Sequence, residues 1–205
     1  MLARLSFALL CACLVATPAL AKDKTAFSCT GVFGPDSSEA LLIKTYGADN
    51  VVTGQVPGAE GIDMLATTVF PNDPDKTMVF GWMNEETREG LGFVDLPPSI
   101  EGPHGVHIGM SVADVLAING QPFNIGGFWW DYGGYAQIEQ GTLANADDAT
   151  CFLSLRFSPA EEYPQDLDVS AVSGEVSIPA DEPLLEKLDT RLTVVSVGFP
   201  SAEAE

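Results

Sequence analysis

The chain has 205 residues, and its 29 acidic and 9 basic side chains give a formal net charge of −20. This charge excludes non-specific binding to nucleic acid, because no basic stripe exists to displace counterions from phosphates. It also argues against adhesion to anionic lipid. The length fits one ordinary domain or two small units with a hydrophobic core.

Residues 1–21 have the parts of a secretory signal, with a charged head at Arg4, an apolar run and a small-residue end. The apolar run is shorter than the roughly 20 residues that span a bilayer, and no later segment approaches that length. We therefore predict a cleaved signal, a mature chain that starts at Lys22, and a periplasmic or secreted bacterial protein with no membrane span. Lipoprotein processing before Cys13 is the alternative, because residues 10–13 loosely resemble a lipobox.

The mature chain keeps two cysteines, Cys29 and Cys151. Two cysteines in an exported protein most simply form one disulfide, which here would tie the N-terminal segment to a point far downstream. A pair of free thiols is the alternative. Neither cysteine has a neighbouring histidine or basic residue in the sequence, so the pattern does not favour a catalytic cysteine.

The first predicted unit covers residues 22–103 and contains one helix followed by strand-like segments. The helix lies between Asp36 and Gly47, with Asp36 as N-cap, Glu39 three positions later, and Gly47 as the terminal glycine. The strand-like segments are rich in β-branched and aromatic residues and are bounded by turn residues. They cover residues 51–56, 64–70, 77–82 and 91–95.

The second predicted unit covers residues 104–199 and follows the same plan. Its helix begins after Met110, where Ser111 as N-cap and Asp114 form a variant of the capping box, and it ends at Gly120. Four strand-like segments follow the helix. They cover residues 123–130, 135–140, 151–157 and 192–199.

The match between the two units predicts an α+β protein, a tandem repeat of a short helix packed on a small antiparallel sheet. When the sequences of the two units are aligned, Gly47 and Gly120 occupy the same position at the end of the helix, and strand-like segments follow both helices. The second unit carries an acidic insertion at residues 158–183, with seven acidic residues and no Lys or Arg, which predicts a solvated surface loop. A short helix is expected after Asp181, and the tail at residues 200–205 is expected to be disordered.

The densest aromatic stretch of the chain lies between two glycine pairs. Alternation along a strand would place Trp130 in the core and Trp129 at or near the surface. Asp131 and Tyr132 begin a Gly-rich hairpin turn, and Tyr135 follows it. Exposed aromatic residues are typical anchors of binding surfaces, so we predict a binding site at Trp129, Asp131, Tyr132 and Tyr135.

The sequence gives little support to a metal site, a cofactor or a catalytic set. Its only histidines, His104 and His107, lie in a turn-like stretch and would need further ligands from elsewhere. There is no Gly-x-Ser-x-Gly elbow, phosphate loop or dinucleotide fingerprint. We therefore predict no metal and no cofactor.

Two segments, residues 109–123 (GMSVADVLAINGQPF) and 127–134 (GFWWDYGG), resemble a family of exported bacterial proteins of no assigned activity. The stretch at residues 70–82 fits the same family, so the resemblance covers most of residues 60–157. The helix motif alone is similar to that of the SmpA/OmlA outer-membrane assembly lipoproteins and to the repeat of β-lactamase inhibitor proteins. Both resemblances imply a helix-plus-sheet binding module without catalysis, although the inhibitor's binding residues have no counterpart that can be mapped onto this chain.

These observations favour a non-catalytic binding or protein-interaction module whose partner is another envelope protein or a basic ligand, because an acidic rim would steer a basic partner. The alternative is an envelope hydrolase that uses carboxylates near Asp131. A purely structural envelope protein is a third possibility. The oligomeric state stays open.

Overall fold

The computed structural model describes residues 25–58, 61–145 and 150–200. The predicted signal at residues 1–21 and the tail beyond residue 200 lie outside the described residues. The helices are α1 (Glu39–Tyr46), α2 (Val112–Asn119) and α3 (Pro183–Lys187). The strands are β1 (Thr25–Ala26), β2 (Val51–Pro57), β3 (Asp63–Val69), β4 (Met78–Asn84), β5 (Glu89–Asp95), β6 (Ile100–Glu101), β7 (Asn124–Gly126), β8 (Ala136–Gln137), β9 (Phe152–Ser158), β10 (Ser177–Pro179) and β11 (Arg191–Gly198).

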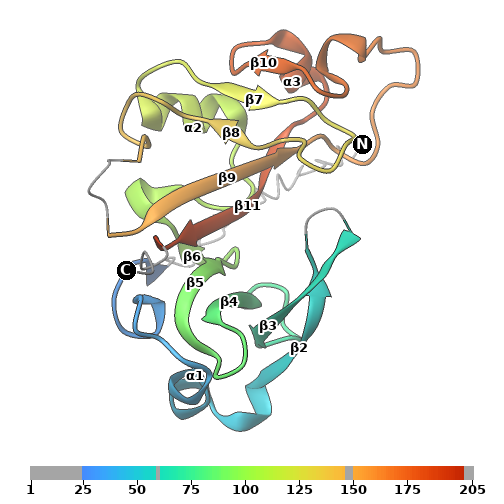
Figure 1. Cartoon of the computed structure of the whole chain (residues 1–205). Helices are drawn as coiled ribbons and strands as arrows, with labels where there is room; N and C mark the ends of the chain where they lie inside the picture. The colour runs from blue at the N-terminus through green and yellow to red at the C-terminus, as the bar shows by residue number, and fades with distance from the viewer. Residues whose placement is uncertain (1–24, 59–60, 146–149, 201–205) are drawn as a thin grey trace, which may run out of the picture.

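Six strands form one antiparallel sheet in the order β2-β3-β4-β5-β11-β9 (Figure 1). Its first four strands follow in chain order, and β11 pairs with β5, placing Ser196 opposite Asp95. A smaller antiparallel sheet has the order β10-β7-β8, and a bridge between Tyr135 and Arg156 connects it to β9. Strands β1 and β6 form a short parallel pair. Few helices and mostly antiparallel sheets confirm the predicted α+β class.

Helix α1 starts later than predicted. Its N-cap is Ser38, whose hydroxyl accepts a hydrogen bond from the Leu41 N–H at 3.3 Å, so the prediction of Asp36 as the cap is wrong. Ser38 has the extended backbone that a cap needs directly before the first helical residue. Gly47 ends the helix, as predicted, with a φ of 85° that favours glycine.

Helix α2 begins and ends as predicted. The Ser111 hydroxyl accepts from the Asp114 N–H at 3.1 Å, and the Asp114 carboxylate accepts from the Ser111 N–H at 3.1 Å, which completes the capping box. Gly120 follows in the left-handed conformation. The last helical residue, Asn119, is buried, and its amide oxygen accepts from the Leu143 N–H at 3.0 Å. This bond attaches the end of α2 to the loop that precedes β9.

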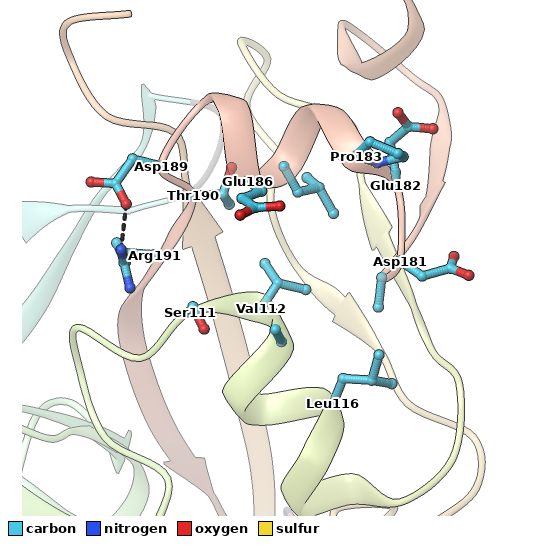
Figure 2. A pocket seen from close by; sticks show the side chains of 13 residues that line it. Ser111, Val112, Leu116, Asp181, Glu182, Pro183, Glu186, Asp189, Thr190 and Arg191 are labelled. Carbon is cyan, nitrogen blue, oxygen red and sulfur yellow. Dashed lines mark hydrogen bonds and ion pairs between the residues drawn. The ribbon is translucent and has the colours of Figure 1, made fainter.

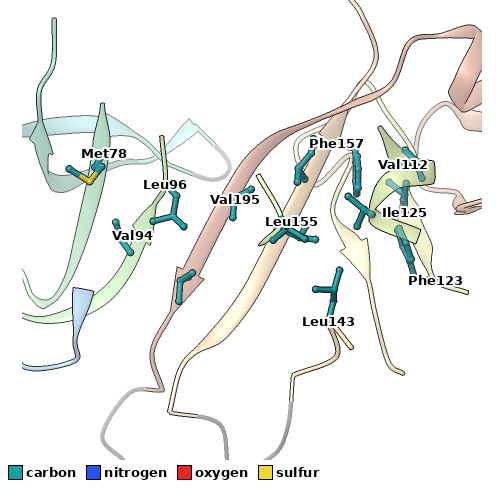
Figure 3. Packing of buried hydrophobic residues seen from close by; sticks show 14 of the residues in the cluster. Met78, Val94, Leu96, Val112, Phe123, Ile125, Leu143, Leu155, Phe157 and Val195 are labelled. Carbon is teal, nitrogen blue, oxygen red and sulfur yellow. The ribbon is translucent and has the colours of Figure 1, made fainter. Parts of the chain in front are cut away.

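The hydrophobic core lies between the helices and one face of the large sheet. Leu42 of α1, Val115 of α2 and Leu185 of α3 are buried there with strand residues such as Phe80 and Leu155. All of them belong to one cluster, and Figure 3 shows its members from β4 and β5 across β11 and β9 to α2. The whole described chain therefore shares a single core.

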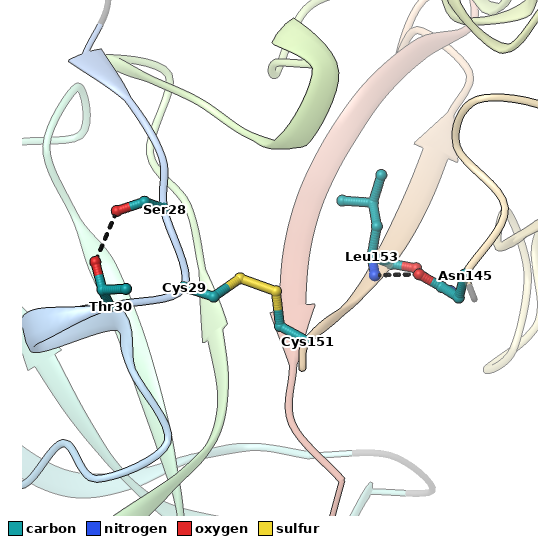
Figure 4. The surroundings of a disulfide bond; sticks show 6 residues. All are labelled: Ser28, Cys29, Thr30, Asn145, Cys151 and Leu153. Carbon is teal, nitrogen blue, oxygen red and sulfur yellow. Dashed lines mark hydrogen bonds between the residues drawn. A yellow bond between two sulfur atoms is a disulfide. The ribbon is translucent and has the colours of Figure 1, made fainter. Parts of the chain in front are cut away.

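A disulfide fastens the N-terminal segment to the start of β9 (Figure 4). The sulfur atoms of Cys29 and Cys151 lie at bonding distance, and their Cα atoms are 6.5 Å apart, within the range of disulfides in known proteins. The predicted pairing is therefore present. Close by, the side chain of Asn145 accepts from the Leu153 N–H at 2.7 Å and donates to its carbonyl oxygen at 3.0 Å.

The strand predicted at residues 123–130 is much shorter in the structure, where β7 spans only three residues. Beyond β7 the chain pairs with the insertion. The N–H of Gly127 donates to the Val176 carbonyl at 2.7 Å, and the N–H of Phe128 donates to the Val172 carbonyl at 2.8 Å. The chain after β7 thus pairs with the insertion and does not continue the ladder with β8.

The insertion at residues 158–183 is more than the solvated loop that its charge predicts. It contributes β10, which pairs with β7, and it buries Val172 and Ile178. The short helix expected after Asp181 is present as α3, with Pro183 in its first turn. An insertion that covers the edge of β7 removes an unpaired strand edge from the smaller sheet.

Candidate functional site

The large sheet has a second face, opposite the helices, which we call the helix-free face. Successive side chains along a strand point to opposite faces, so each strand that buries residues under the helices presents a second set on this side. The strand registers align that second set across the sheet. Its large or polar members include Val52, Val56, Met64, Thr68, Val79, Met83, Phe93, Asp95, Phe152, Ser154, Arg156, Val194 and Ser196.

Large hydrophobic side chains on the helix-free face are open to solvent. Val52 is 52% exposed, Met83 46% and Phe152 41%. Tyr135, whose bridge to Arg156 places it on the same side, is 40% exposed. These side chains come from several strands, including the two edge strands β2 and β9. Large apolar side chains left open to solvent on one sheet face are candidates for contact with a partner.

Two phenylalanine rings cover glycines of neighbouring strands on this face. Phe93 lies opposite Gly81 and Phe152 opposite Gly198 in the strand registers. A Cβ atom added to either glycine would overlap the facing ring, so only glycine lets the rings occupy these positions. The rings therefore rest against the sheet backbone and make a fixed apolar floor.

One carboxyl group lies within this face. Asp95 is opposite Val79 on β4 and Ser196 on β11. Burial raises the pKa of the Asp95 carboxyl above its usual range, while a hydrogen bond with Ser196 opposes that rise. The group is thus a largely covered carboxyl between Val79 and Ser196 on the helix-free face.

Arg156 organises the neighbouring turn. Its guanidinium lies over the Tyr135 ring, 5.0 Å from the ring centroid, in a cation–π contact. Its Nε donates to the Gly133 carbonyl at 2.8 Å, and its Nη2 donates to the Asp131 carbonyl at 3.2 Å. One side chain therefore holds both the turn and the aromatic residue that follows it.

A hollow of about 490 Å³ lies beside Tyr135. Tyr132, Trp130 and Val176 supply its apolar walls, and Glu175 lies at its polar side. The rings of Trp130 and Tyr132 meet edge to face, with centroids 5.6 Å apart. The hollow adds an aromatic recess to the end of the helix-free face.

Trp129 lies outside this recess. It is 52% exposed and packs its ring between Phe128 and Tyr163, with both centroid distances at 5.9 Å. Its φ of 61° is unusual for a bulky residue. The prediction that Trp130 would be the core residue is wrong: Phe128 is buried, and Trp130 is half-buried with its indole N–H donating to the Gly127 carbonyl at 2.8 Å.

The structure thus brings together some of the predicted site residues. Tyr132 and Tyr135 line one recess, and Asp131 is an exposed turn residue whose backbone accepts from Arg156. Trp129 lines a different hollow with Tyr163. The exposed sheet residues of the helix-free face were not anticipated from the sequence.

Within residues 25–58, 61–145 and 150–200, no three His, Cys, Asp or Glu side chains are grouped as a metal ion would require. His107 interacts through Nδ1 with the Gly105 carbonyl at 3.0 Å, which belongs to the local turn. Asp131 lies in the turn that Arg156 holds, and its side chain is exposed. An exposed carboxylate is a weak candidate for general acid chemistry.

Comparisons with protein-family models, with curated proteins and with solved structures find no significant match to the chain. None of the helices in the described part of the chain is long and apolar enough to cross a bilayer.

Proposed function

We propose that the chain is an exported, non-catalytic protein-interaction module that binds its partner through the helix-free face. The observation that carries this proposal is the set of exposed side chains Val52, Met83, Tyr135 and Phe152 on one side of the sheet. The opposite side already supplies the core, so folding alone does not account for them. Surface patches that combine aromatic residues and methionine are typical of protein interfaces.

The fixed positions of the aromatic side chains on the helix-free face support the same proposal. The rings of Phe93 and Phe152 rest on neighbouring glycines, and Arg156 holds Tyr135. Anchors that are already ordered lose little conformational entropy when a partner binds. Complete burial of one such side chain contributes roughly 1.5–3 kcal/mol, so two or three anchors supply a useful affinity.

The net charge of −20 favours a basic partner. A protein of this charge attracts positively charged molecules over distances of about a Debye length, which raises the association rate. The effect falls with ionic strength, so we expect association to slow as salt is added.

Export is supported by the signal-like segment at residues 1–21 and by the cysteine pair Cys29–Cys151. Structural disulfides persist in oxidising compartments and are rare in the cytosol. We therefore assign the module to the bacterial periplasm or to the medium.

We also propose that the chain is a tandem repeat, with α1 to β5 as one unit and α2 to β11 as the other. The corrected cap of α1 strengthens this proposal, because Ser38 and Ser111 now have the same spacing as Gly47 and Gly120. Both helices have 8 residues, and the terminal glycine of each donates its N–H to a carbonyl four residues earlier.

Strand pairing supports the repeat as well. Ser38 bridges Glu89, the first residue of β5, and Ser111 bridges Arg191, the first residue of β11. In space β2-β3-β4-β5 corresponds to β7-β8-β9-β11, with the Tyr135 bridge in place of a longer β8–β9 ladder. The last strands of the two units pair with each other. Such an arrangement extends one sheet face across both units and enlarges the surface available to a partner.

The proposed interface can be tested by comparing immobilised mature protein with a Tyr135→Ala/Phe152→Ala variant in capture from the exported fraction of the source cells. We expect the variant to lose at least about tenfold of the partner that the parent protein retains, a change of about 1.4 kcal/mol in binding free energy. The matched control is Ile43→Ala, because Ile43 is 39% exposed but lies on α1. Equal capture by the parent, the double variant and the control would contradict the proposal.

A Trp129→Ala variant separates the helix-free face from the neighbouring aromatic hollow. Trp129 lines the hollow that contains Tyr163, so its loss should affect capture less than the double substitution does. A larger loss in Trp129→Ala would move the interface to that hollow.

A further inference from the structure

A groove of about 460 Å³ lies between the first turns of α2 and the α3 segment (Figure 2). Its walls come from two stretches far apart in the sequence, the start of α2 and residues 180–191. Both helices pack on the core side of the sheet, so the groove is separate from the helix-free face. We refer to it as the α2–α3 groove.

The floor of the α2–α3 groove is apolar. Val112 and Leu185 are almost fully buried, Leu116 is half-buried, and Ala113 is open to solvent. Figure 2 shows Val112 and Leu116 on α2 facing the segment that carries α3. The small side chain of Ala113 beside the half-buried Leu116 leaves room for one large apolar side chain of a partner.

The rim of the groove is acidic. Asp181, Glu186 and Asp189 are exposed around it, and Glu182 accepts a hydrogen bond from the Leu184 N–H at 3.1 Å. These four carboxylates lie within nine consecutive residues of the chain.

The only basic side chain among the groove residues is already paired. The guanidinium of Arg191 forms an ion pair with Asp189, on the side of the groove away from Asp181 (Figure 2). Asp181, Glu182 and Glu186 therefore leave a negative field beside the apolar floor. An apolar groove with one sign of charge at its rim selects partners of the opposite sign.

We infer that the α2–α3 groove docks a cationic amphipathic peptide segment of a partner protein. One large apolar side chain of the segment lies against Ala113 and Leu116, above the buried Val112 and Leu185, while Lys or Arg side chains face Asp181 and Glu186. This surface is additional to the proposed interface on the helix-free face. A partner that engages both would gain affinity from two linked contacts.

The test uses fluorescence anisotropy of a labelled peptide made of Lys and Leu in an amphipathic pattern, with the full mature protein. Asp181→Asn/Glu186→Gln should weaken peptide binding by about tenfold, because it removes both rim charges beside the floor. The matched control is Glu85→Gln/Glu86→Gln, an equal change of net charge at two exposed residues between β4 and β5. The control should change binding by less than about twofold. All four positions are exposed, so the variants should fold, and circular dichroism checks that they do.

Three results would overturn the inference. Equal weakening by the rim variant and the control would show attraction to the overall charge alone. Equal binding of a peptide with Ser in place of Leu would show that the apolar floor takes no part. Loss of peptide binding in Tyr135→Ala/Phe152→Ala would place the peptide on the helix-free face, whereas retention of binding there supports the groove and leaves the two proposals separable.

Discussion

The two faces of the large sheet are built from the same strands but differ in how far their side chains are exposed. On β9, Leu155 and Phe157 are buried under the helices, while Phe152 on the opposite face is 41% exposed. On β4, Phe80 is buried and Met83 is 46% exposed. The helix-covered face holds most of the large buried side chains, and the helix-free face keeps large apolar side chains that are open to solvent. This difference is the physical basis for assigning the second face to binding.

The largest expected difference between the faces is in folding stability. Phe80→Ala should lower the free energy of unfolding by about 3–5 kcal/mol, because it removes a fully buried ring and leaves a cavity. Phe152→Ala should cost about 1 kcal/mol or less, because that ring is already partly in water. Denaturant unfolding of both variants measures the two values. Similar costs would mean that the helix-free face is part of the core and would remove the distinction.

The disulfide at the margin of the covered core should have the next largest effect. The double variant Cys29→Ser/Cys151→Ser should lose about 2–4 kcal/mol, because the unfolded chain is no longer constrained by a long closed loop. Urea unfolding with and without reductant measures the loss. Parent protein under reducing conditions should match the double variant, and insensitivity of the parent to reductant would contradict the structural role of the bond.

A smaller change in folding stability is expected from substitution of Asp95 on the helix-free face. Burial raises the pKa of its carboxyl in the folded state, so the folded protein binds this proton more tightly than the unfolded chain does. Stability therefore falls as the pH rises from the ordinary Asp value of about 3.9 through the raised pKa, and the penalty persists at pH 7. Asp95→Asn should accordingly be more stable than the parent at neutral pH, and its advantage should shrink as the pH falls through the raised pKa of Asp95 and be nearly lost by about pH 4.

Ser196→Ala is the matched variant for that test. The Ser196 hydrogen bond opposes the rise in the pKa of Asp95, so its loss should lower stability at neutral pH. Unfolding curves at neutral and acidic pH measure both effects. An advantage of Asp95→Asn that is independent of pH would show that titration of this carboxyl is not its cause.

Local sequence signals predicted the helices well where a single choice was available. Ser111, Asp114 and Gly120 define α2 because capping depends on residues a few positions apart. At α1, Asp36 and Ser38 are both competent caps, and the structure uses Ser38. Competition between neighbouring polar residues is decided by the backbone path that enters the helix, which no short pattern encodes.

Long-range pairing limited what could be predicted of the site. Tyr135 was identified because it ends an aromatic turn, but Phe152 was not. Its strand reads Phe-Leu-Ser-Leu-Arg-Phe and begins with two adjacent apolar residues, Phe152 and Leu153, which would point to opposite faces. Alternation alone therefore does not assign Phe152 to a face. The assignment comes from the register of β9 on β11, where Phe152 lies opposite Gly198. Pairing of the last strand between β5 and β9 is a property of the whole fold.

The most direct test of the proposed interface is photo-crosslinking from the two sides of the molecule. A benzoyl-phenylalanine at position 152 replaces an exposed ring on the helix-free face, and the same group at position 43 lies on α1. We expect irradiation in the exported fraction to attach one defined protein to position 152 and not to position 43, and an excess of parent protein should suppress the product. Equal labelling from both positions, or labelling from position 43 alone, would contradict the assignment of the helix-free face as the binding surface.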